Sequence, residues 1–387
     1  MDDKAMETKF LETRMPGSSP AAKELREKVA RLNREELVNK EPFRRVVLIE
    51  GPTGAGKGRF AREICAHWNW HKMSREHQLA YLNGNTTALQ MLRDTVDEDF
   101  LSVSAPDLIG PVGWGTLVGV KKGSYTDAVE KEGVLGSDSS HILVDEIADA
   151  PPDLQSQLLK LLQDRRRQPI GGCDNDEKPI RARLLFACNR PLAAEVRAGR
   201  FRDDLLHRMT EHFRIPGLDG DHVRIRDLVL SLVHEILSEK HEHTKRGLST
   251  AGPSAGDLDW AAKQQWPGNV RQLRAAIDSW VYSLLLDVPP KALSECAKRE
   301  PEPPHNKPLD EEVIARELVL KLLSSGKKLA SYKSFTDHVD VLFAKALFRL
   351  LEDELPNSRV LKDVFGDKVK SIKDQARRRV RGEIEKP

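Results

Sequence analysis

Long hydrophobic runs are missing from this sequence of 387 residues. Its longest apolar stretches, such as VYSLLL after Trp280, are far shorter than the roughly 20 residues that a membrane-spanning helix needs. The opening residues MDDKAMETKF are acidic, and no apolar segment follows them, which excludes a secretory signal peptide. We therefore expect a cytoplasmic protein with no membrane partner.

Cysteine is also scarce, with four residues in the whole chain. Cys65, Cys173, Cys188 and Cys296 follow neither a CxxC pattern nor a metal-ligand spacing, so reduced structural thiols are expected. The composition is 39% hydrophobic and 32% charged, as in folded globular domains. The net charge of +2 identifies no partner, but basic residues crowd the C-terminal end.

Changes of pattern divide the chain. We expect a loose leader over residues 1–20, an α/β nucleotide-binding subdomain over 21–218 and a helical lid over 219–298. The charged, proline-rich stretch REPEPPHNKP at 299–308 is typical of a linker to a separate all-helical segment at 309–387. We expect no sensor domain ahead of the first strand, because the segment there is shorter than the smallest domains, which have about 50 residues.

The α/β pattern begins with RRVVLIE at 44–50, a continuous apolar strand of the kind buried in a parallel sheet. Further strands are expected at HQLAYLN (77–83), HILVDE (141–146) and RARLLFACN (181–189), with enough chain between them for crossovers. PPDLQSQLLKLLQD (151–164) has leucines at helical spacing. The predicted fold class is α/β with a parallel sheet.

A phosphate-binding loop follows the first strand directly. GPTGAGK fits the pattern G-x-x-x-x-G-K between a strand and a helix, and a plain glycine turn is disfavoured in that context. Backbone N–H groups and the helix start favour anions, and the lysine adds a positive charge. No hydroxyl follows the lysine to bind Mg²⁺. The predicted cofactors are ATP and Mg²⁺, and the predicted binding residues are Gly51, Pro52, Thr53, Gly54, Ala55, Gly56, Lys57 and Gly58.

Two acidic residues end the strand HILVDE. At the carboxyl end of a buried strand, Asp145 is placed to hold Mg²⁺ and Glu146 to accept a proton from the attacking water. The alternative is an acidic helix start. Asn189 ends the following strand and could orient that water, although an Asn there is also an ordinary turn residue.

Three arginines are candidates for neutralising phosphate charge. Arg202 and Arg208 in RFRDDLLHRM suit an arginine supplied across a subunit interface, although surface arginines are commonly only solvated. Arg271 in WPGNVR follows a turn into a lid helix, from which it could reach the nucleotide.

These motifs together resemble the AAA+ ATPase domain of NtrC-like activators of sigma-54 RNA polymerase. The resemblance covers residues 20–285 and rests on GPTGAGKG, two strands ending in Asn83 and Asn189, HILVDEIADAPPDLQSQLLKLLQD, AGRFRDDLLHRM and WPGNVRQLR. It implies a P-loop AAA+ parallel sheet with a helical lid. It also implies that Asn83 pairs with Glu146 and switches it with nucleotide state.

The same resemblance implies roles for the other candidates. Asn189 resembles sensor I and Arg271 resembles sensor II. Arg202 and Arg208 match arginine fingers that act in trans, which implies a homo-oligomeric ring, typically a hexamer.

The aperiodic stretch GVKKGSYTDA at 119–128 interrupts the nucleotide-binding fold. The resembling family carries a mobile GAFTGA loop there, which contacts sigma-54 and moves with ATP hydrolysis. Gly123 and Thr126 agree with that motif, whereas Asp127 replaces a glycine and restricts the backbone. Gly123, Tyr125 and Thr126 are the expected partner contacts. The alternative is a surface loop that no longer engages the factor.

The segment 309–387 predicts an all-α, helix-turn-helix-like DNA-binding domain, with Gly366 at the tight turn before its last helix. That helix is basic, and the alternative is a solvated basic tail. The predicted DNA-binding residues are Lys370, Lys373, Arg377 and Arg378.

These features predict an ATP-hydrolysing transcriptional activator that binds DNA and remodels closed complexes of sigma-54 RNA polymerase. Two alternatives remain open. One is an AAA+ ATPase that remodels a different protein, with the basic C-terminus as a nucleic-acid anchor. The other is a nucleotide-dependent DNA-binding switch that remodels nothing. With no sensor domain expected ahead of Arg45, control would come from a regulatory protein in trans, from concentration-dependent assembly, or be absent.

Overall fold

The computed structural model describes residues 2–38, 45–124, 129–241, 252–285 and 292–296. Two compact units are distinguished, Met1–Glu300 and Pro301–Pro387, and the described residues belong to the first. The predicted linker at 299–308 and the helical segment at 309–387, with its DNA-binding candidates, lie outside the described residues. No helix in the described part is long and apolar enough to span a bilayer.

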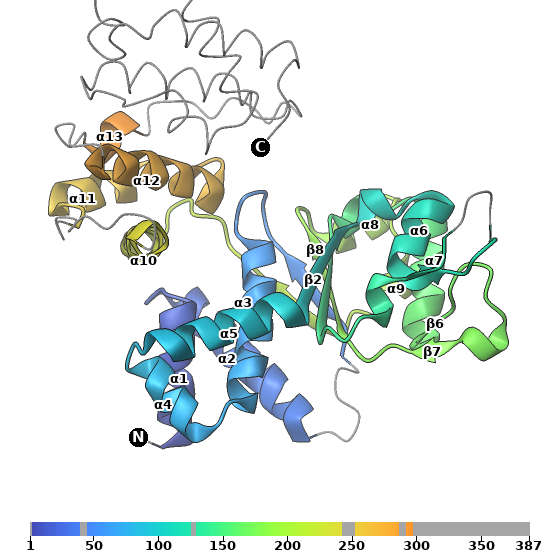
Figure 1. The fold of residues 1–387 in the computed structure, drawn as a ribbon. Coiled ribbons are helices and arrows are strands. Elements are labelled where there is room, and N and C mark those ends of the chain that lie inside the picture. Colours follow the sequence, from blue (N-terminus) through green and yellow to red (C-terminus); the bar gives the residue numbers. More distant parts are fainter. Residues whose placement is uncertain (1, 39–44, 125–128, 242–251, 286–291, 297–387) are drawn as a thin grey trace, which may run out of the picture. The chain divides into compact units, whose positions relative to one another are not determined.

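A five-stranded parallel sheet in the order β2-β5-β8-β1-β9 forms the centre of the first unit (Figure 1). Its strands are β1 (Val47–Glu50), β2 (Phe100–Ser104), β5 (His141–Asp145), β8 (Arg183–Cys188) and β9 (Glu211–Arg214). The three inner strands, β5, β8 and β1, are buried almost throughout, which is why their sequences are continuous apolar runs. The predicted α/β class with a parallel sheet is confirmed.

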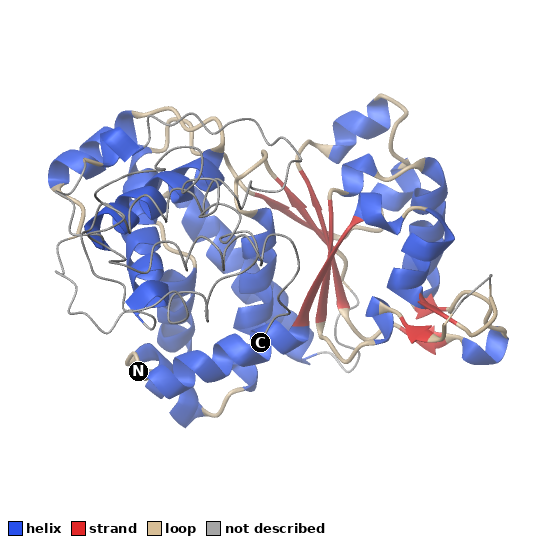
Figure 2. Cartoon of the chain, turned by 45° about the horizontal axis from the view of Figure 1, so that its top comes forward, coloured by secondary structure: helices blue, strands red, loops and turns tan. Residues whose placement is uncertain are grey.

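Alternate strand residues point into two separate hydrophobic cores, with Val47 and Ile49 facing one and Leu48 the other. The first core is covered by α1 (Asp3–Arg14), α2 (Pro20–Val38), α3 (Lys57–Lys72), α4 (Arg75–Leu82) and α5 (Thr86–Asp99). The second is covered by α6 (Gly110–Val118), α7 (Pro152–Asp164), α8 (Leu192–Arg197) and α9 (Asp203–Leu206). Figure 2 shows the strands between these helical layers, so the carboxyl ends of the strands form one edge that the helices leave accessible.

Residues 77–83 form no strand, so that prediction is wrong. They lie in and just after α4, whose N-cap Ser74 accepts a hydrogen bond from the backbone N–H of His77. Tyr81 is the buried residue of this helix. The apolar letters of HQLAYLN fit a helix and a strand equally well at this length, and the Ser74 cap decides between them.

Residues 3–14 form helix α1, so the loose leader predicted for 1–20 is also wrong. Met6 and Phe10 are buried, and the Phe10 ring stacks on Trp70 of α3 with centroids 4.9 Å apart. Their spacing is helical, but the Pro- and Ser-rich stretch that follows is typical of an unstructured end.

A buried network fastens α1 to α3. Glu7 Oε1 lies 3.1 Å from His67 Nε2 and 3.1 Å from His71 Nε2, close enough for the three side chains to be considered as metal ligands. However, Asn33 donates its amide N–H to Nδ1 of His67 at 2.9 Å, and its amide oxygen accepts from Arg183, which fixes that orientation. Nε2 of His67 therefore carries the proton, so it has no lone pair for a metal.

Acidification is expected to destabilise the fold through this network. Burial lowers the pKa of His67 from 6.5 to about 4, so the unfolded chain takes up this proton before the folded protein does. Burial raises the pKa of Glu7, but hydrogen bonds with the two histidines outweigh it and lower the value to about 2. Both groups therefore stabilise the fold fully above their unfolded pKa values, and this stabilisation is lost as the pH falls. His67 alone is expected to lower the free energy of unfolding by about 2 kcal/mol between about pH 7.5 and about pH 5, measured by urea denaturation.

The matched control for this pH dependence is His77, which is exposed on α4. The His67→Gln variant should lose most of the change in unfolding free energy with pH, and His77→Gln should retain it. Equal pH dependence in the two variants would contradict the role of His67.

Within the described residues, the chain after the sheet forms a helical lid with its own hydrophobic core. The lid helices are α10 (His222–His241), α11 (Ala255–Lys263), α12 (Asn269–Leu285) and α13 (Leu293–Cys296). Trp266 is buried between α11 and α12 and donates its indole N–H to the carbonyl of Ala261 at 2.9 Å. The helical character predicted for 219–298 is therefore present in the described part.

Candidate functional site

The phosphate loop runs between β1 and α3 and passes directly beneath the lid. Gly54 and Gly56 have φ of 75° and 94°, in the left-handed region that favours glycine. A Cβ on Gly54 would lie 2.3 Å from the carbonyl oxygen of Gly268, so a larger residue would push the lid away. Gly56 is the N-cap of α3, and the first N–H groups of that helix open toward the loop.

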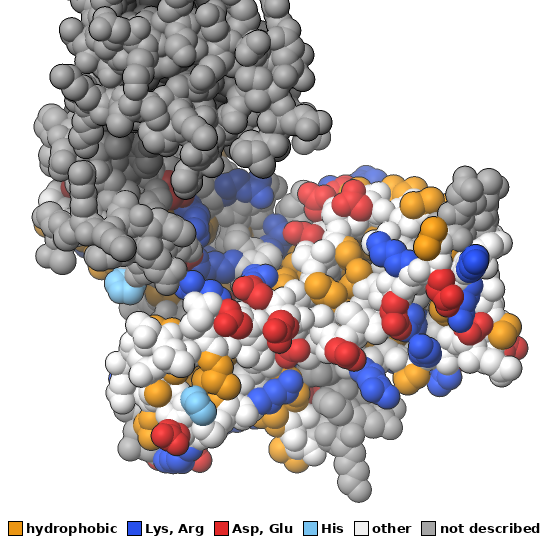
Figure 3. All heavy atoms as spheres, viewed as in Figure 1, with side chains coloured by type: hydrophobic (Ala, Val, Ile, Leu, Met, Phe, Trp, Pro, Cys, Tyr) orange, Lys and Arg blue, Asp and Glu red, His pale blue; other side chains and the backbone are white. Residues whose placement is uncertain are grey.

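Lys57 begins α3 and turns its side chain back over the loop. Its ammonium donates to the carbonyl of Gly51 at 2.9 Å and to that of Pro52 at 3.1 Å. Burial lowers the pKa of Lys57, and the carboxylate of Asp145 acts against this. Lys and Arg side chains gather around the start of α3 (Figure 3). Because the Lys57 ammonium is held by hydrogen bonds to backbone carbonyls, it can exchange these bonds for a hydrogen bond to a phosphate oxygen.

Asp145 and Glu146 lie at the carboxyl end of β5. Asp145 Oδ1 accepts the backbone N–H of Glu146 at 2.8 Å. Glu146 has φ of 57°, a left-handed conformation that is strained for a residue with a side chain. Its Oε2 accepts a hydrogen bond from the hydroxyl of Ser104, on the neighbouring strand, at 3.1 Å.

Ser104, rather than Asn83, contacts Glu146. Asn83 is the C-cap of α4 and belongs to no strand of the sheet, so the prediction that it pairs with Glu146 is wrong. Ser104 ends β2 and stands in register with Asp145. The sequence contains a signal for this residue, because FLSVS alternates apolar and polar residues before an Ala-Pro turn.

Asn189 stands between the two acids and the phosphate loop. It follows β8, which lies between β5 and β1 in the sheet, and its side chain is exposed. Glu50, which ends β1, accepts the backbone N–H of Leu192 at 2.9 Å and so fixes the start of α8. The geometry leaves Asn189 available to a bound water at this edge.

The lid contacts the phosphate loop through the turn before α12. Arg271 donates its backbone N–H to the carbonyl of Gly54 at 3.1 Å, which places it beside the loop. Asn269, which was not among the residues predicted from the sequence, donates its amide N–H to the carbonyl of Thr53 at 2.9 Å and accepts the N–H of Leu218 at 2.9 Å. Asn269 therefore joins the loop to the lid and to the segment that connects lid and sheet.

A largely apolar pocket opens beside the phosphate loop, and the sequence analysis did not predict it. The loop contributes Ala55 and Gly56, and the other walls come from distant parts of the sequence. The apolar walls include Met15, Pro16, Ile215, Pro216, Leu228 and Val270. Because this pocket adjoins the helix start that favours phosphates, it is placed to receive the base of a nucleotide.

Arg202 and Arg208 are exposed near α9. Arg202 forms a two-bond ion pair with Asp204, at 3.0 Å and 2.7 Å. Across the described residues, no hydrogen bond or ion pair joins either arginine to the phosphate loop, Asp145 or Glu146 of its own chain. The structure thus brings the phosphate loop, Asp145, Glu146, Asn189 and Arg271 to one sheet edge, but not these two arginines or Asn83.

The first part of the segment 119–128 is fastened to a neighbouring hairpin. Two small hairpins lie here, formed by β3 (Gly119–Val120) with β4 (Lys131–Glu132) and by β6 (Arg166–Arg167) with β7 (Lys178–Pro179). Lys121 donates its N–H to the carbonyl of Ile170 at 3.0 Å, and Ser124 donates its hydroxyl to the same carbonyl at 2.9 Å. Residues 119–124 are therefore anchored to the segment between β6 and β7.

Of the expected partner contacts, Gly123 lies in this fastened part, with φ of 80°. Tyr125 and Thr126 lie outside the described residues. A further tie is the ion pair between Lys121 and Asp176, at 3.0 Å.

The chain is similar in sequence to known proteins. The Sigma-54 interaction domain family matches residues 15–214, which is more than half of the chain. FleR, a response regulator protein of Pseudomonas aeruginosa, is 31% identical over 263 residues, or 67% of this chain and 46% of FleR. ZraR, a transcriptional regulatory protein of Escherichia coli, is 31% identical over 273 residues, or 70% of this chain and 53% of ZraR. The chain spans about half the length of these curated relatives.

The fold is also similar to a crystal structure of NtrX from Brucella abortus in complex with ADP. The TM-score is 0.51 at 23% identity, over 83% of this chain and 66% of NtrX, which shows the fold alone. The parallel sheet with its phosphate loop and lid is that of a P-loop AAA+ domain. With a family match over more than half its length, the chain belongs to the family of proteins that carry the sigma-54 interaction domain.

Proposed function

We propose that this protein is an ATP-hydrolysing transcriptional activator that remodels closed complexes of sigma-54 RNA polymerase through the loop at 119–128. The observation that carries the proposal is the meeting of Lys57, Asp145 and Glu146 at one sheet edge, beside a phosphate loop and under a lid. Family membership supports the partner. Nucleotide binding, stated for NtrX in its complexes with ADP and ATP, is proposed for this chain.

The residues present fit a nucleoside triphosphate with its Mg²⁺ ion. Lys57 and the first N–H groups of α3 would hold the outer phosphates, and Arg271 would approach them from the lid. Asp145 supplies a carboxylate oxygen for Mg²⁺, and Gly58 supplies none, so water would complete the coordination. When bound, Mg²⁺ would neutralise part of the phosphate charge.

Glu146 is proposed as the general base, with Asn189 orienting the water whose proton Glu146 accepts. The hydrogen bond from Ser104 restrains the Glu146 carboxylate, and we assign to Ser104 the switching role that the resemblance gave to Asn83. Ser104 is connected to residue 119 only through a short 3-10 turn, Ala105–Leu108, and α6. A movement of Ser104 would therefore be transmitted to the loop at 119–128 through this turn and α6.

Arg202 and Arg208 are proposed to complete the site of a neighbouring subunit. Both side chains are exposed. The Asp204 carboxylate that Arg202 contacts carries less charge than a triphosphate, so a triphosphate would compete with Asp204 for the guanidinium of Arg202. An arginine that acts in trans on every subunit requires a head-to-tail ring, which we propose to be a hexamer.

One further part of the proposal rests on the sequence alone. Residues 309–387 would bind DNA through the basic set Lys370, Lys373, Arg377 and Arg378.

The test of the partner assignment is Thr126→Ala. This variant is expected to lose binding to isolated sigma-54 in the presence of a non-hydrolysable ATP analogue, while ATP turnover persists, because the loop lies apart from the acids and the phosphate loop in the sequence. Co-sedimentation measures the binding. Thr116→Ala on α6 is the matched control, since among the described residues the hydroxyl of Thr116 bonds within its own helix, to the carbonyl of Val112 at 3.2 Å.

Undiminished binding by Thr126→Ala would remove the loop from the partner contact. A second candidate function, an AAA+ ATPase that remodels a different protein, is favoured by Asp127, because it places a charge where the resembling motif has glycine. ATP turnover by the wild type without any binding to sigma-54 would select that second function.

A further inference from the structure

Two short segments with the same chemical pattern line the apolar pocket. Met15-Pro16-Gly17 joins α1 to α2, and Ile215-Pro216-Gly217 joins β9 to the lid. Both segments contribute their apolar residue and their proline to the pocket lining. The two segments are about 200 positions apart in the sequence, so no local pattern shows that they share a pocket.

Each segment is held by a single arginine that binds two of its carbonyls. Nη1 of Arg26, on α2, donates to the carbonyl of Met15 at 2.9 Å and to that of Gly17 at 2.7 Å. Nη1 of Arg224, on α10, donates to the carbonyl of Pro216 at 2.8 Å and to that of Gly217 at 3.3 Å. Arg26 is only 7% exposed, so its charge is satisfied by these carbonyls and not by solvent.

The first segment is also tied to the lid. The backbone N–H and the hydroxyl of Ser18 both donate to Oδ2 of Asp227, on α10, at 2.8 Å and 2.9 Å. Nearby, Arg14 at the end of α1 forms a two-bond ion pair with Glu63 of α3, at 2.6 Å and 3.1 Å. Residues 14–18 thus contact the helix that begins at the phosphate loop and the lid at the same time.

We propose that Arg26 is a positioning residue for recognition of the nucleotide base. It holds residues 15–17 as one wall of the base pocket, Arg224 holds residues 216 and 217 as another, and the tie from Ser18 to Asp227 closes the lid against the first wall. The proposal rests on the proposed ATP binding. Arg26 acts through the segment and does not contact the phosphates, so its loss should affect the base and spare the phosphate loop.

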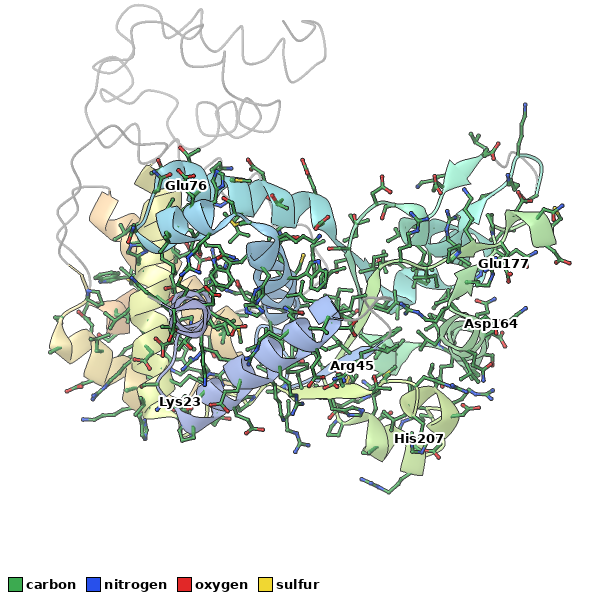
Figure 4. All side chains as sticks on the ribbon, turned by 90° about the horizontal axis from the view of Figure 1, so that it is seen from below. Lys23, Arg45, Glu76, Asp164, Glu177 and His207 are labelled. Carbon is green, nitrogen blue, oxygen red and sulfur yellow. The ribbon has the colours of Figure 1, made fainter. Side chains whose placement is uncertain are left out.

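The experiment compares two ligands that share the phosphate site and differ in the base. Dissociation constants for ATP and for inorganic tripolyphosphate are measured with the full chain, as wild type and as Arg26→Met. Loss of the charged hydrogen bonds is expected to weaken ATP by about tenfold to a hundredfold and to leave tripolyphosphate binding unchanged. Lys23→Met is the control, because Lys23 lies on the same helix but is exposed and drawn at the outer edge of the molecule (Figure 4).

Steady-state kinetics give a second readout, since Arg26→Met should raise KM for ATP and leave kcat near the wild-type value. Asp227→Ala keeps the test valid if Arg26→Met does not fold, because Asp227 forms a surface tie. Asp227→Ala should weaken the binding of ATP severalfold and leave the binding of tripolyphosphate unchanged.

An equal effect on both ligands, or no effect on ATP in either variant, would overturn the role of Arg26. Failure of the wild type to bind ATP would instead overturn the proposed ATPase function, and the inference with it.

Discussion

Glu146→Gln is expected to bind ATP like the wild type and to hydrolyse it about 10²–10⁴-fold more slowly. The amide keeps the size of the side chain and can still accept the hydrogen bond from Ser104, but it cannot take a proton from water. Steady-state phosphate release measures the loss, and binding of a fluorescent ATP analogue confirms that the site is intact. Glu98→Gln is the matched control, since Glu98 is an exposed carboxylate at the end of α5.

Ser104→Ala separates the base from the residue that restrains it. Removing the hydroxyl frees the Glu146 carboxylate without changing its chemistry, so hydrolysis should persist and its coupling to the loop at 119–128 should weaken.

Normal turnover by Glu146→Gln would show that another group accepts the proton. A loss in Ser104→Ala as large as that in Glu146→Gln would give Ser104 a direct part in catalysis.

Arg202→Ala is expected to lower ATP hydrolysis by about 10³-fold, the smaller end of the effect of an arginine finger. The side chain is exposed and, within the described residues, contacts Ser156 and Asp204 rather than its own phosphate loop. Its contribution would therefore be made in the neighbouring subunit. Arg197→Ala is the control, because Arg197 is an exposed arginine at the end of the preceding helix, α8.

Mixing experiments distinguish a contribution in trans from a structural one. Lys57→Ala subunits lack the phosphate lysine but keep Arg202, so next to an Arg202→Ala subunit they can complete one site. Equimolar mixtures should recover part of the hydrolysis that neither variant shows alone. No recovery, in mixtures shown to form rings, would argue that Arg202 acts within its own chain.

The inner strands could be predicted from the sequence, whereas the edge strands were missed. β5 and β8 are buried on both faces, which leaves continuous apolar runs that few other structures explain. β2, FLSVS, and β9, EHFR, lie at the sheet edges and contain polar residues, so their patterns are weaker than a continuous apolar run. Missing β2 had a direct consequence, since the residue expected beside Glu146 was sought in HQLAYLN and not at Ser104.

The phosphate site was predictable because its residues are contiguous, whereas the base pocket was not. Gly51 to Lys57 form one motif whose backbone supplies the chemistry. The pocket is assembled from the α1–α2 connection, the β9–α10 connection and two lid helices, which only the folded chain brings together. Likewise, Met6 and Phe10 have helical spacing, but only the structure shows that α3 offers a surface to receive them.

ATP hydrolysis by this chain is proposed to open a promoter bound by sigma-54 RNA polymerase. The most direct measurement is the appearance of single-stranded promoter DNA in a purified system with polymerase, sigma-54, the full chain and ATP. Opening is expected with the wild type and not with Lys57→Ala or Thr126→Ala. A wild-type protein that forms rings and hydrolyses ATP but leaves the promoter closed would contradict it.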